Sequence, residues 1–304
     1  MADLEADSTA PLAPAVPTAP APAPPPAAML VGQVRYQLRL FWRNPRSAFS
    51  SFALPVMLVV FINALHGGER LAGGVTFAQV VTAGVAVFGV VAVCYANLAS
   101  TLVAARDLGV LKRLQGTPLP PWVHVASRVA VSMLVALAQV VVMVALAAAL
   151  FGVRPVVHTL AATVLTLVVG GACFSALGLA ASTFIPNSSA AQAVLTASYL
   201  PVVLASNVFS PLGDRPSWMG ALASAFPVQH LAAALQIDFN PLTPGSGVQA
   251  AHLAHLAAWT VVGTAVYLRR SRSDEASAGE GSAGPGGRRR DRRGWRFLAS
   301  GSAG

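Results

Sequence analysis

The chain has 304 residues, of which 55% are hydrophobic and only 10% are charged, against about 25% in an average soluble domain. The formal net charge of +9 lies mostly at the two ends, because positions 47–268 hold only seven basic and four acidic residues. This pattern excludes a water-soluble globular domain, and it favours a membrane surface over nucleic acid as the partner of the basic ends.

Both ends of the chain are expected to be disordered. Positions 1–28 are acidic and rich in Ala and Pro, and positions 269–304 are rich in Gly, Ser and Arg, so neither segment can bury a core. The first segment has no basic stretch followed by an apolar one, and it therefore does not resemble a signal peptide. The Arg-rich end of the second segment resembles a polybasic lipid contact, with a solvated tail as the alternative.

Positions 29–46 predict an amphipathic helix. At about 100° per residue, Arg35, Arg39 and Arg43 fall on one side, while the apolar residues, Trp42 among them, fall on the other. A membrane span follows directly, so we expect this helix to lie in the membrane interface with its Arg side chains toward anionic headgroups. An ordinary amphipathic helix in water is the alternative.

Six of the stretches that follow are apolar and long enough to cross a hydrocarbon core of about 30 Å, which needs about 20 helical residues. They are 47–65, 77–105, 122–151, 157–185, 189–211 and 248–268. The sequence therefore predicts an all-α integral membrane protein, whose transmembrane domain at 47–268 contains six helices behind the interfacial helix. Basic residues are richer on one side of this arrangement, which places both termini in the cytoplasm by the positive-inside rule.

The segment 212–247 is the longest connection, and it lies outside the cell in this topology. Pro227 interrupts its apolar stretch, which is also too short to be a full span. We therefore expect a re-entrant helical segment between the fifth and sixth helices, covered by protein or lining a cavity.

The predicted fourth helix carries a pattern of small residues. Ala172, Ala176 and Ala180 recur every four positions, with Gly171 and Ser175 beside them. Small residues at this spacing let two helices approach closely, but the sequence does not say which helix is the neighbour.

Sequence patterns for catalysis are missing. The chain has no Walker A pattern GxxxxGK[ST], no HExxH and no GxSxG, so we predict no catalytic residue, no metal and no nucleotide site. His252 and His255 lie three positions apart without a third ligand nearby in sequence, which favours an interfacial polar contact over a metal site. None of the predicted spans contains Asp or Glu, which argues against transport driven by protons or sodium ions.

Four segments, in their order along the chain, resemble a known family. They are FWRNPRSAFSSFALPVMLVV, ARDLGVLKRLQGTPLPPWVHVASR, SALGLAASTFIPNSSAAQAVLTASYLPVVLASNVFSP and PSWMGALASAFPVQHLAAAL. Together they resemble the membrane-spanning permease subunit of type-2 ABC exporters, especially the drug- and antibiotic-export branch, over positions of about 30 to 268.

The resemblance implies that two permease chains form a dimer with two copies of a separate ATPase. That ATPase would hold ATP and Mg²⁺, so this chain would bind no cofactor itself. The loop at positions 106–117 would dock into the ATPase, and its expected polar contacts are Arg106, Asp107, Lys112 and Arg113. Relatives commonly carry an acid at the position of Ala105, so no contact is carried over there. A plain basic loop that only sets topology is the alternative.

The resemblance also implies that the first, second and fifth helices line the transport path and the dimer interface. In this sequence the expected path residues are Asn97, Ser198, Asn207 and Phe209. The outer segment would close the exit as a gate, whose expected residues are Phe226, Pro227 and Gln229.

The function that the resemblance implies is ATP-driven export of a small apolar or amphipathic compound across the plasma membrane. The expected partners are an ABC ATPase, a second permease chain, membrane lipids and the small-molecule substrate, and no nucleic acid. Three alternatives stay open: a permease for a glycan or lipid within the same family, a membrane-embedded hydrolase, and a membrane scaffold or immunity protein that transports nothing.

Overall fold

The computed structural model describes residues 24–66, 68–71, 75–110, 120–154, 156–206, 208, 220 and 223–282. This part of the chain is built from helices, with one isolated antiparallel bridge between Arg70 and Thr76. The elements are α1 (Pro26–Arg43), α2 (Pro45–His66), α3 (Phe77–Val91), η1 (Ala92–Asn97), α4 (Leu98–Asp107), α6 (Pro121–Phe151), η2 (Val157–Thr159), α7 (Leu160–Ser182), α8 (Ser188–Ala205), α10 (Pro227–Asp238) and α11 (Ala250–Ser282).

Among the residues that the structure describes, five helical segments are long and apolar enough to cross a membrane, namely Phe77–Asp107, Trp122–Phe151, Val157–Ser182, Ser188–Ala205 and Ala250–Ser273. The first predicted span corresponds to α2, whose apolar part Ser51–His66 is shorter. The chain is therefore an all-α integral membrane protein, as predicted, while the count of six spans stays a prediction. α11 continues to Ser282, past the expected end of the transmembrane domain at position 268.

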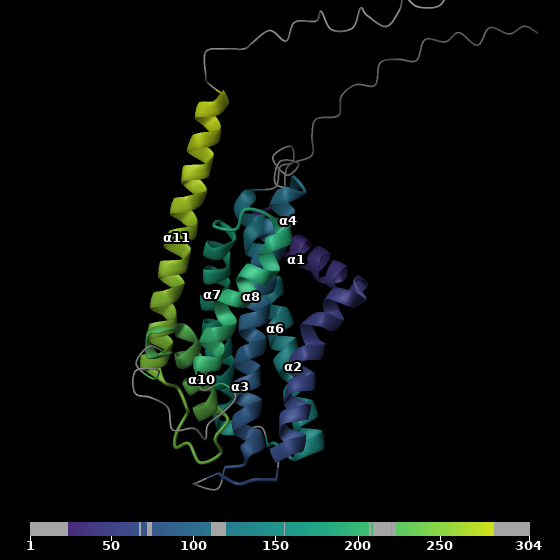
Figure 1. Cartoon of the computed structure of the whole chain (residues 1–304), viewed down its shortest axis with the longest axis vertical. Coiled ribbons are helices and arrows are strands. Elements are labelled where there is room, and N and C mark those ends of the chain that lie inside the picture. Colours follow the sequence, from purple (N-terminus) through teal and green to yellow (C-terminus); the bar gives the residue numbers. More distant parts are fainter. Residues whose placement is uncertain are drawn as a thin grey trace, which may run out of the picture.

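The long helices run along the vertical axis of Figure 1, whereas α1 lies across that axis. α4 ends and α8 begins at the upper end of this view, which we call the upper end of the protein. α3 begins at the lower end, and the short helix α10 lies near it. The described helix bundle therefore has two distinct ends, with the end of α4 at one and α10 near the other.

Local sequence signals account for where the helices begin and end. α6 begins with Pro121 in its first turn, where a backbone N–H is not needed, and it ends at Gly152 with a left-handed φ of +67°. α3 begins with a capping box formed by Thr76 and Gln79. Pro227 ends the preceding stretch and opens α10, so this proline starts a helix where the sequence suggested only an interruption.

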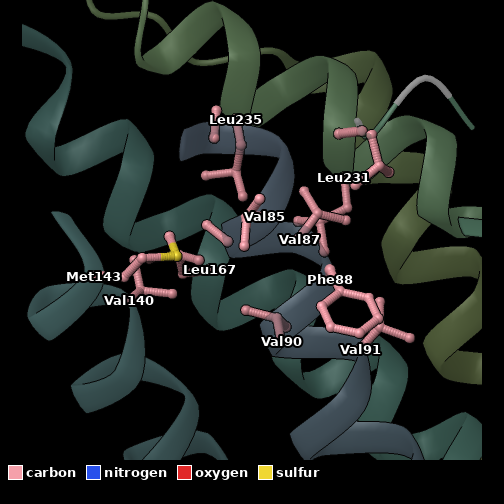
Figure 2. Packing of buried hydrophobic residues seen from close by; sticks show 14 of the residues in the cluster. Val85, Val87, Phe88, Val90, Val91, Val140, Met143, Leu167, Leu231 and Leu235 are labelled. Carbon is pink, nitrogen blue, oxygen red and sulfur yellow. The ribbon is translucent and has the colours of Figure 1, made fainter. Parts of the chain in front are cut away.

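The core forms around α3, which is buried over nearly its whole length. Side chains from α3, such as Val85 and Phe88, pack against residues of α6, α7 and α10 (Figure 2). Leu231 and Leu235 place the short helix α10 in this core, although it is not one of the five spanning candidates. Because lipid tails are as apolar as these side chains, close packing holds the helices together in a membrane more than burial does.

Two segments of the same chain pack closely against small residues of α7. A Cβ added to Gly263 of α11 would lie 2.9 Å from the carbonyl carbon of Ala176. A Cβ added to Gly178 would lie 2.8 Å from the carbonyl oxygen of Tyr95 in η1. Ala176 of the predicted small-residue pattern thus lets α11 approach the backbone of α7, whereas η1 approaches at Gly178, which lies outside that pattern.

Candidate functional site

A cavity of about 220 Å³ lies between η1, α7, α8, α11 and the start of α10, and we call it the aromatic cavity. Its aromatic lining consists of Tyr95, Phe174, Tyr199, Phe226 and Trp259, and the other lining residues are Val91, Leu177, Ser198, Val202, Pro227 and Val228. An apolar cavity with few polar groups is typical of small-molecule sites, which usually have about 300–1,000 Å³. The aromatic cavity therefore suits one ring system or one end of a drug-sized compound.

Tyr95 and Ser198 supply the polar group of the aromatic cavity. Their hydroxyl oxygens lie 2.8 Å apart, and the Ser198 hydroxyl donates to the Leu195 carbonyl oxygen at 2.7 Å. Because Ser198 has a single proton and uses it there, the Tyr95 hydroxyl donates to Ser198. Both oxygens keep lone pairs, so this hydroxyl pair can accept a hydrogen bond from a ligand.

Tyr95 belongs to a short π-helix inside the second predicted span. The π-helical segment η1 interrupts the α-helical hydrogen bonding between α3 and α4. Such segments are rare and frequently occur at functional sites, because they change which side chains share a helix face. Here Tyr95 lines the aromatic cavity, while Val93 and Asn97 line a second cavity near α1 and α6.

Of the four expected path residues, the two that the structure describes line different cavities. Ser198 lines the aromatic cavity, whereas Asn97 lines the second cavity. Asn207 and Phe209 lie outside the described residues. Sequence reasoning missed Tyr95, because an apolar span gives no sign of a π-helix.

α10 brings two of the three expected gate residues to the aromatic cavity. Phe226 and Pro227 line the cavity at the point where α10 begins. Gln229 is not among the lining residues, and its buried Oε1 atom has no hydrogen-bond partner within the described part of the chain. The start of α10 thus forms one wall of the aromatic cavity.

Three histidines meet beside that wall, although the sequence suggested only two. His230 Nε2 lies 2.9 Å from the Ser224 carbonyl oxygen, so this nitrogen carries a proton, and His230 Nδ1 lies 2.8 Å from His252 Nδ1. The Trp259 indole donates to His255 Nε2 at 3.1 Å, and the His230 and His255 rings stack with centroids 3.8 Å apart. This arrangement joins α10 to α11 through stacked and hydrogen-bonded imidazole rings. Burial, together with the neighbouring histidines, lowers the pKa of His230.

Arg106 and Asp107, two expected contacts of the ATPase, bond within the chain. The Arg106 guanidinium donates to the carbonyl oxygens of Ser182, at 3.3 Å, and Ile185. The Ser188 backbone N–H donates to Asp107 Oδ2 at 2.6 Å. These bonds tie the end of α4 to the connection between α7 and α8. The other two expected contacts, Lys112 and Arg113, lie outside the described residues.

The expected interfacial helix corresponds to α1, which is a helix from Pro26 to Arg43. Arg35, Arg39 and Arg43 are exposed, and Trp42 is 59% exposed beside the ring of Phe41. α1 packs on α6 and contains no buried residue, so it lies on the surface of the helix bundle.

A family model described as ABC-2 type transporter matches residues 33–239, which is more than half of the chain. The chain belongs to the ABC-2 type transporter family. It is therefore a multi-pass membrane protein and a permease component of an ABC transporter, and its family implies an ABC ATPase as partner. A comparison with curated proteins gave no match.

The matched range of this ABC-2 permease runs from α1 to the end of α10. It includes η1, the bonds of Arg106 and Asp107, and most of the aromatic cavity. Trp259 of α11 lies beyond the match, so α11 adds a wall to the cavity that the family model does not cover.

Asp238, the last residue of α10, is a buried acid that sequence reasoning did not single out. It is 1% exposed, and its Oδ2 accepts a hydrogen bond of 3.0 Å from Thr166 of α7, while its Oδ1 has no partner within the described residues. Burial raises the pKa of Asp238 from 3.8 to about 6. The apolar residues that precede Asp238 in the sequence were the available sign that this acid is buried.

We expect Asp238→Asn to raise the stability of the ABC-2 permease above pH 6. Folding raises this pKa, so stability from Asp238 is greatest at low pH and falls as pH rises through about 6. The free energy of unfolding falls between pH 3.8 and about pH 6, by about 1.4 kcal/mol per pH unit. The total loss above pH 6 is therefore about 3 kcal/mol. Thermal unfolding in detergent at pH 5 and pH 7.5 measures it, and a variant that is less stable than the parent at pH 7.5 would contradict this explanation.

Proposed function

We propose that this ABC-2 permease exports a small apolar or amphipathic compound from the cell as a homodimer. A separate ATPase subunit holds ATP and Mg²⁺ and drives the transport. The protein lies in the plasma membrane with both termini in the cytoplasm, so its upper end faces the cytoplasm and α10 lies on the outer side. The aromatic cavity is the observation that carries this proposal.

The lining of the aromatic cavity favours an apolar or amphipathic substrate over a strongly polar one. Its five aromatic rings can stack on a substrate ring, and each such pair adds about 0.5–1.5 kcal/mol beyond the burial of area. The hydroxyl pair of Tyr95 and Ser198 can orient one donor group of the substrate. A glycan would leave most of its hydroxyl groups without hydrogen-bond partners against these walls.

The contacts at the upper end support a route for coupling to the ATPase. Arg106 and Asp107 fix the start of the loop after α4 to the connection between α7 and α8. We propose that Lys112 and Arg113, further along that loop, contact the ATPase. A shift of the loop would then move α4 together with α7 and α8. Residues of α7 and α8 line the aromatic cavity, so the shift would reach the cavity.

Exposed apolar side chains support the proposed dimer and the lipid contact. α2 exposes Leu54, Met57, Phe61 and Leu65, and α8 exposes Val194 and Leu204. In a membrane these side chains face lipid or another chain, because exposing so many apolar side chains to water would be strongly unfavourable.

The proposal is tested by purifying the chain together with the ABC ATPase of its own organism. We expect the two to form a complex whose ATPase rate rises with hydrophobic dyes or drugs. Stimulation by glycans or lipids alone would instead favour the glycan or lipid exporter. If no ABC ATPase binds the chain, a scaffold or immunity protein becomes the better interpretation.

Ser198→Phe should weaken the stimulation of the ATPase by such compounds. The added ring occupies the aromatic cavity, so we expect at least a tenfold higher concentration for half-maximal stimulation. Ala197→Phe is the matched control, because it adds the same ring to an adjacent exposed position that does not line the cavity. Equal responses of the two variants would contradict a substrate site at Ser198.

A further inference from the structure

A second cavity of about 540 Å³ lies at the upper end of the protein, between α1, α6 and the segment from η1 to α4. We call it the upper cavity. Its polar lining residues are Gln33, Tyr36, Gln37, Asn44, Asn97, Thr101, His124, Arg128 and Ser132. Its apolar lining residues are Leu40, Phe41, Val93, Leu98, Val110, Val131 and Val135. The upper cavity therefore has a polar part and an apolar part, unlike the aromatic cavity.

His124 and Arg128 bring unpaired polar atoms to the upper cavity. They lie four positions apart on α6, so they share one face of the helix. His124 is 5% exposed, and neither of its ring nitrogens has a hydrogen-bond partner within the described residues. The Arg128 Nε atom is buried and equally unpartnered there. Arg128 as a whole is partly buried, and a cation with one N–H removed from water and unpaired is stabilised when an anion pairs with it.

The described lining of the upper cavity offers no such anion, because none of its residues carries a carboxylate. Arg128 also lies only about 10 Å along α6 from the first residue of that helix. The site is therefore near the upper end of the bundle and close to α1. An anion that enters from the upper membrane surface can reach it.

We propose that the upper cavity binds a phosphate group, with Arg128 as its charge partner and His124 as a second hydrogen-bond donor. A phospholipid is the source that the cavity favours over free phosphate, because apolar side chains of α1 and α6, such as Phe41 and Val135, continue the cavity beside the polar groups. Exposed Arg35, Arg39 and Arg43 on α1 attract anionic headgroups to the same end. In the proposed orientation this phospholipid belongs to the cytoplasmic leaflet. That assignment rests on the proposed function, whereas the phosphate site itself does not.

A bound headgroup would join α1 to the transmembrane helices. α1 already contacts α6 through the Gln37 amide, which donates to the Ser127 hydroxyl at 2.7 Å. Ser127 in turn donates to the His124 carbonyl oxygen at 2.8 Å. The lipid would add a second connection beside this one, between the Arg128 side chain and the wall that α1 provides.

The experiment uses the purified full-length chain in detergent, stripped of lipid. Phosphatidylglycerol, phosphatidylcholine or inorganic phosphate is added, and bound lipid is counted by native mass spectrometry while thermal unfolding is followed. We expect phosphatidylglycerol to bind and to raise the unfolding midpoint, and Arg128→Gln to weaken this binding at least tenfold. Phosphatidylcholine should bind more weakly, because its ammonium group opposes Arg128. Arg154→Gln is the charge-matched control, since Arg154 is exposed outside the upper cavity, and it should bind phosphatidylglycerol as the parent does.

Two further variants keep the test decisive. Without lipid, Arg128→Gln should be at least as stable as the parent, because it removes a partly buried charge whose Nε atom has no partner within the described residues. If Arg128→Gln does not fold, Arg128→Lys should keep the binding and His124→Gln should weaken it. Unchanged binding of phosphatidylglycerol in Arg128→Gln or in His124→Gln would overturn the site. Equal protection by inorganic phosphate would overturn the assignment to a lipid. None of these measurements depends on transport, so the proposed function can fail separately.

Discussion

Gly178→Ala is expected to lower the stability of the permease by about 1–3 kcal/mol, as other overpacked cores do. The new Cβ would lie 2.8 Å from the Tyr95 carbonyl oxygen and 3.0 Å from the Cys94 carbonyl oxygen. Both atoms belong to the backbone of η1, so neither can rotate away as a side chain would. The variant should therefore displace η1 and with it the Tyr95 hydroxyl that bonds Ser198.

Gly171→Ala is the matched control for this prediction. It makes the same change two turns away on α7, where the new Cβ would lie 3.6 Å from the nearest atom, Met133 Cγ. We expect it to change the unfolding midpoint little. Thermal unfolding of both variants in detergent measures the difference, and the same midpoint for the two would show that η1 and α7 are not packed as closely as described.

Lys112→Glu combined with Arg113→Glu is expected to reduce transport at least tenfold while the protein still folds. Reversing two charges at a contact places like charges opposite each other, which opposes binding of the ATPase. Co-purification of the ATPase and export of a fluorescent substrate measure the two consequences. Arg106→Ala should behave differently, because it removes the bonds to Ser182 and Ile185 and should lower stability as well.

Arg70→Glu combined with Arg154→Glu is the control for this charge reversal. Both residues lie at exposed positions in the connections away from the upper end, and the pair makes the same change in net charge. We expect it to leave binding of the ATPase unchanged. If the loop variant transports normally, or if both double variants lose the ATPase equally, the loop is not the specific contact.

The spans and several helix ends were predictable because they depend on local properties. A helix crosses a membrane when its residues are apolar over sufficient length, and the segment Trp122–Phe151 satisfies this by composition alone. Gly152 and Pro227 mark helix boundaries through their own backbone geometry. The span of α2 is the weakest of the predicted six, because its apolar part is short.

The candidate site was predictable only in part. Ser198, Phe226 and Pro227 line the aromatic cavity, and their roles in a path and a gate, which the resemblance to type-2 exporters implied, stay predictions. Tyr95 was missed because a π-helix changes the face on which it lies, and because its hydroxyl bonds Ser198 of α8, which is distant in sequence. His230 was missed because it meets His252 only when α10 packs on α11.

The sequence by itself determined that this protein lies in a membrane, because apolar length and the scarcity of charge are properties of each segment alone. It also indicated that another helix can pack closely against α7, since small residues recur along one face of that helix. Only the tertiary structure decided which helices pack against α7, and which of the few charged groups are buried. Asp238 is buried against Thr166 of α7, and Arg128 and its helical neighbour His124 are enclosed by α1 and the segment from η1 to α4, so the environment of each group depends on helices distant in sequence.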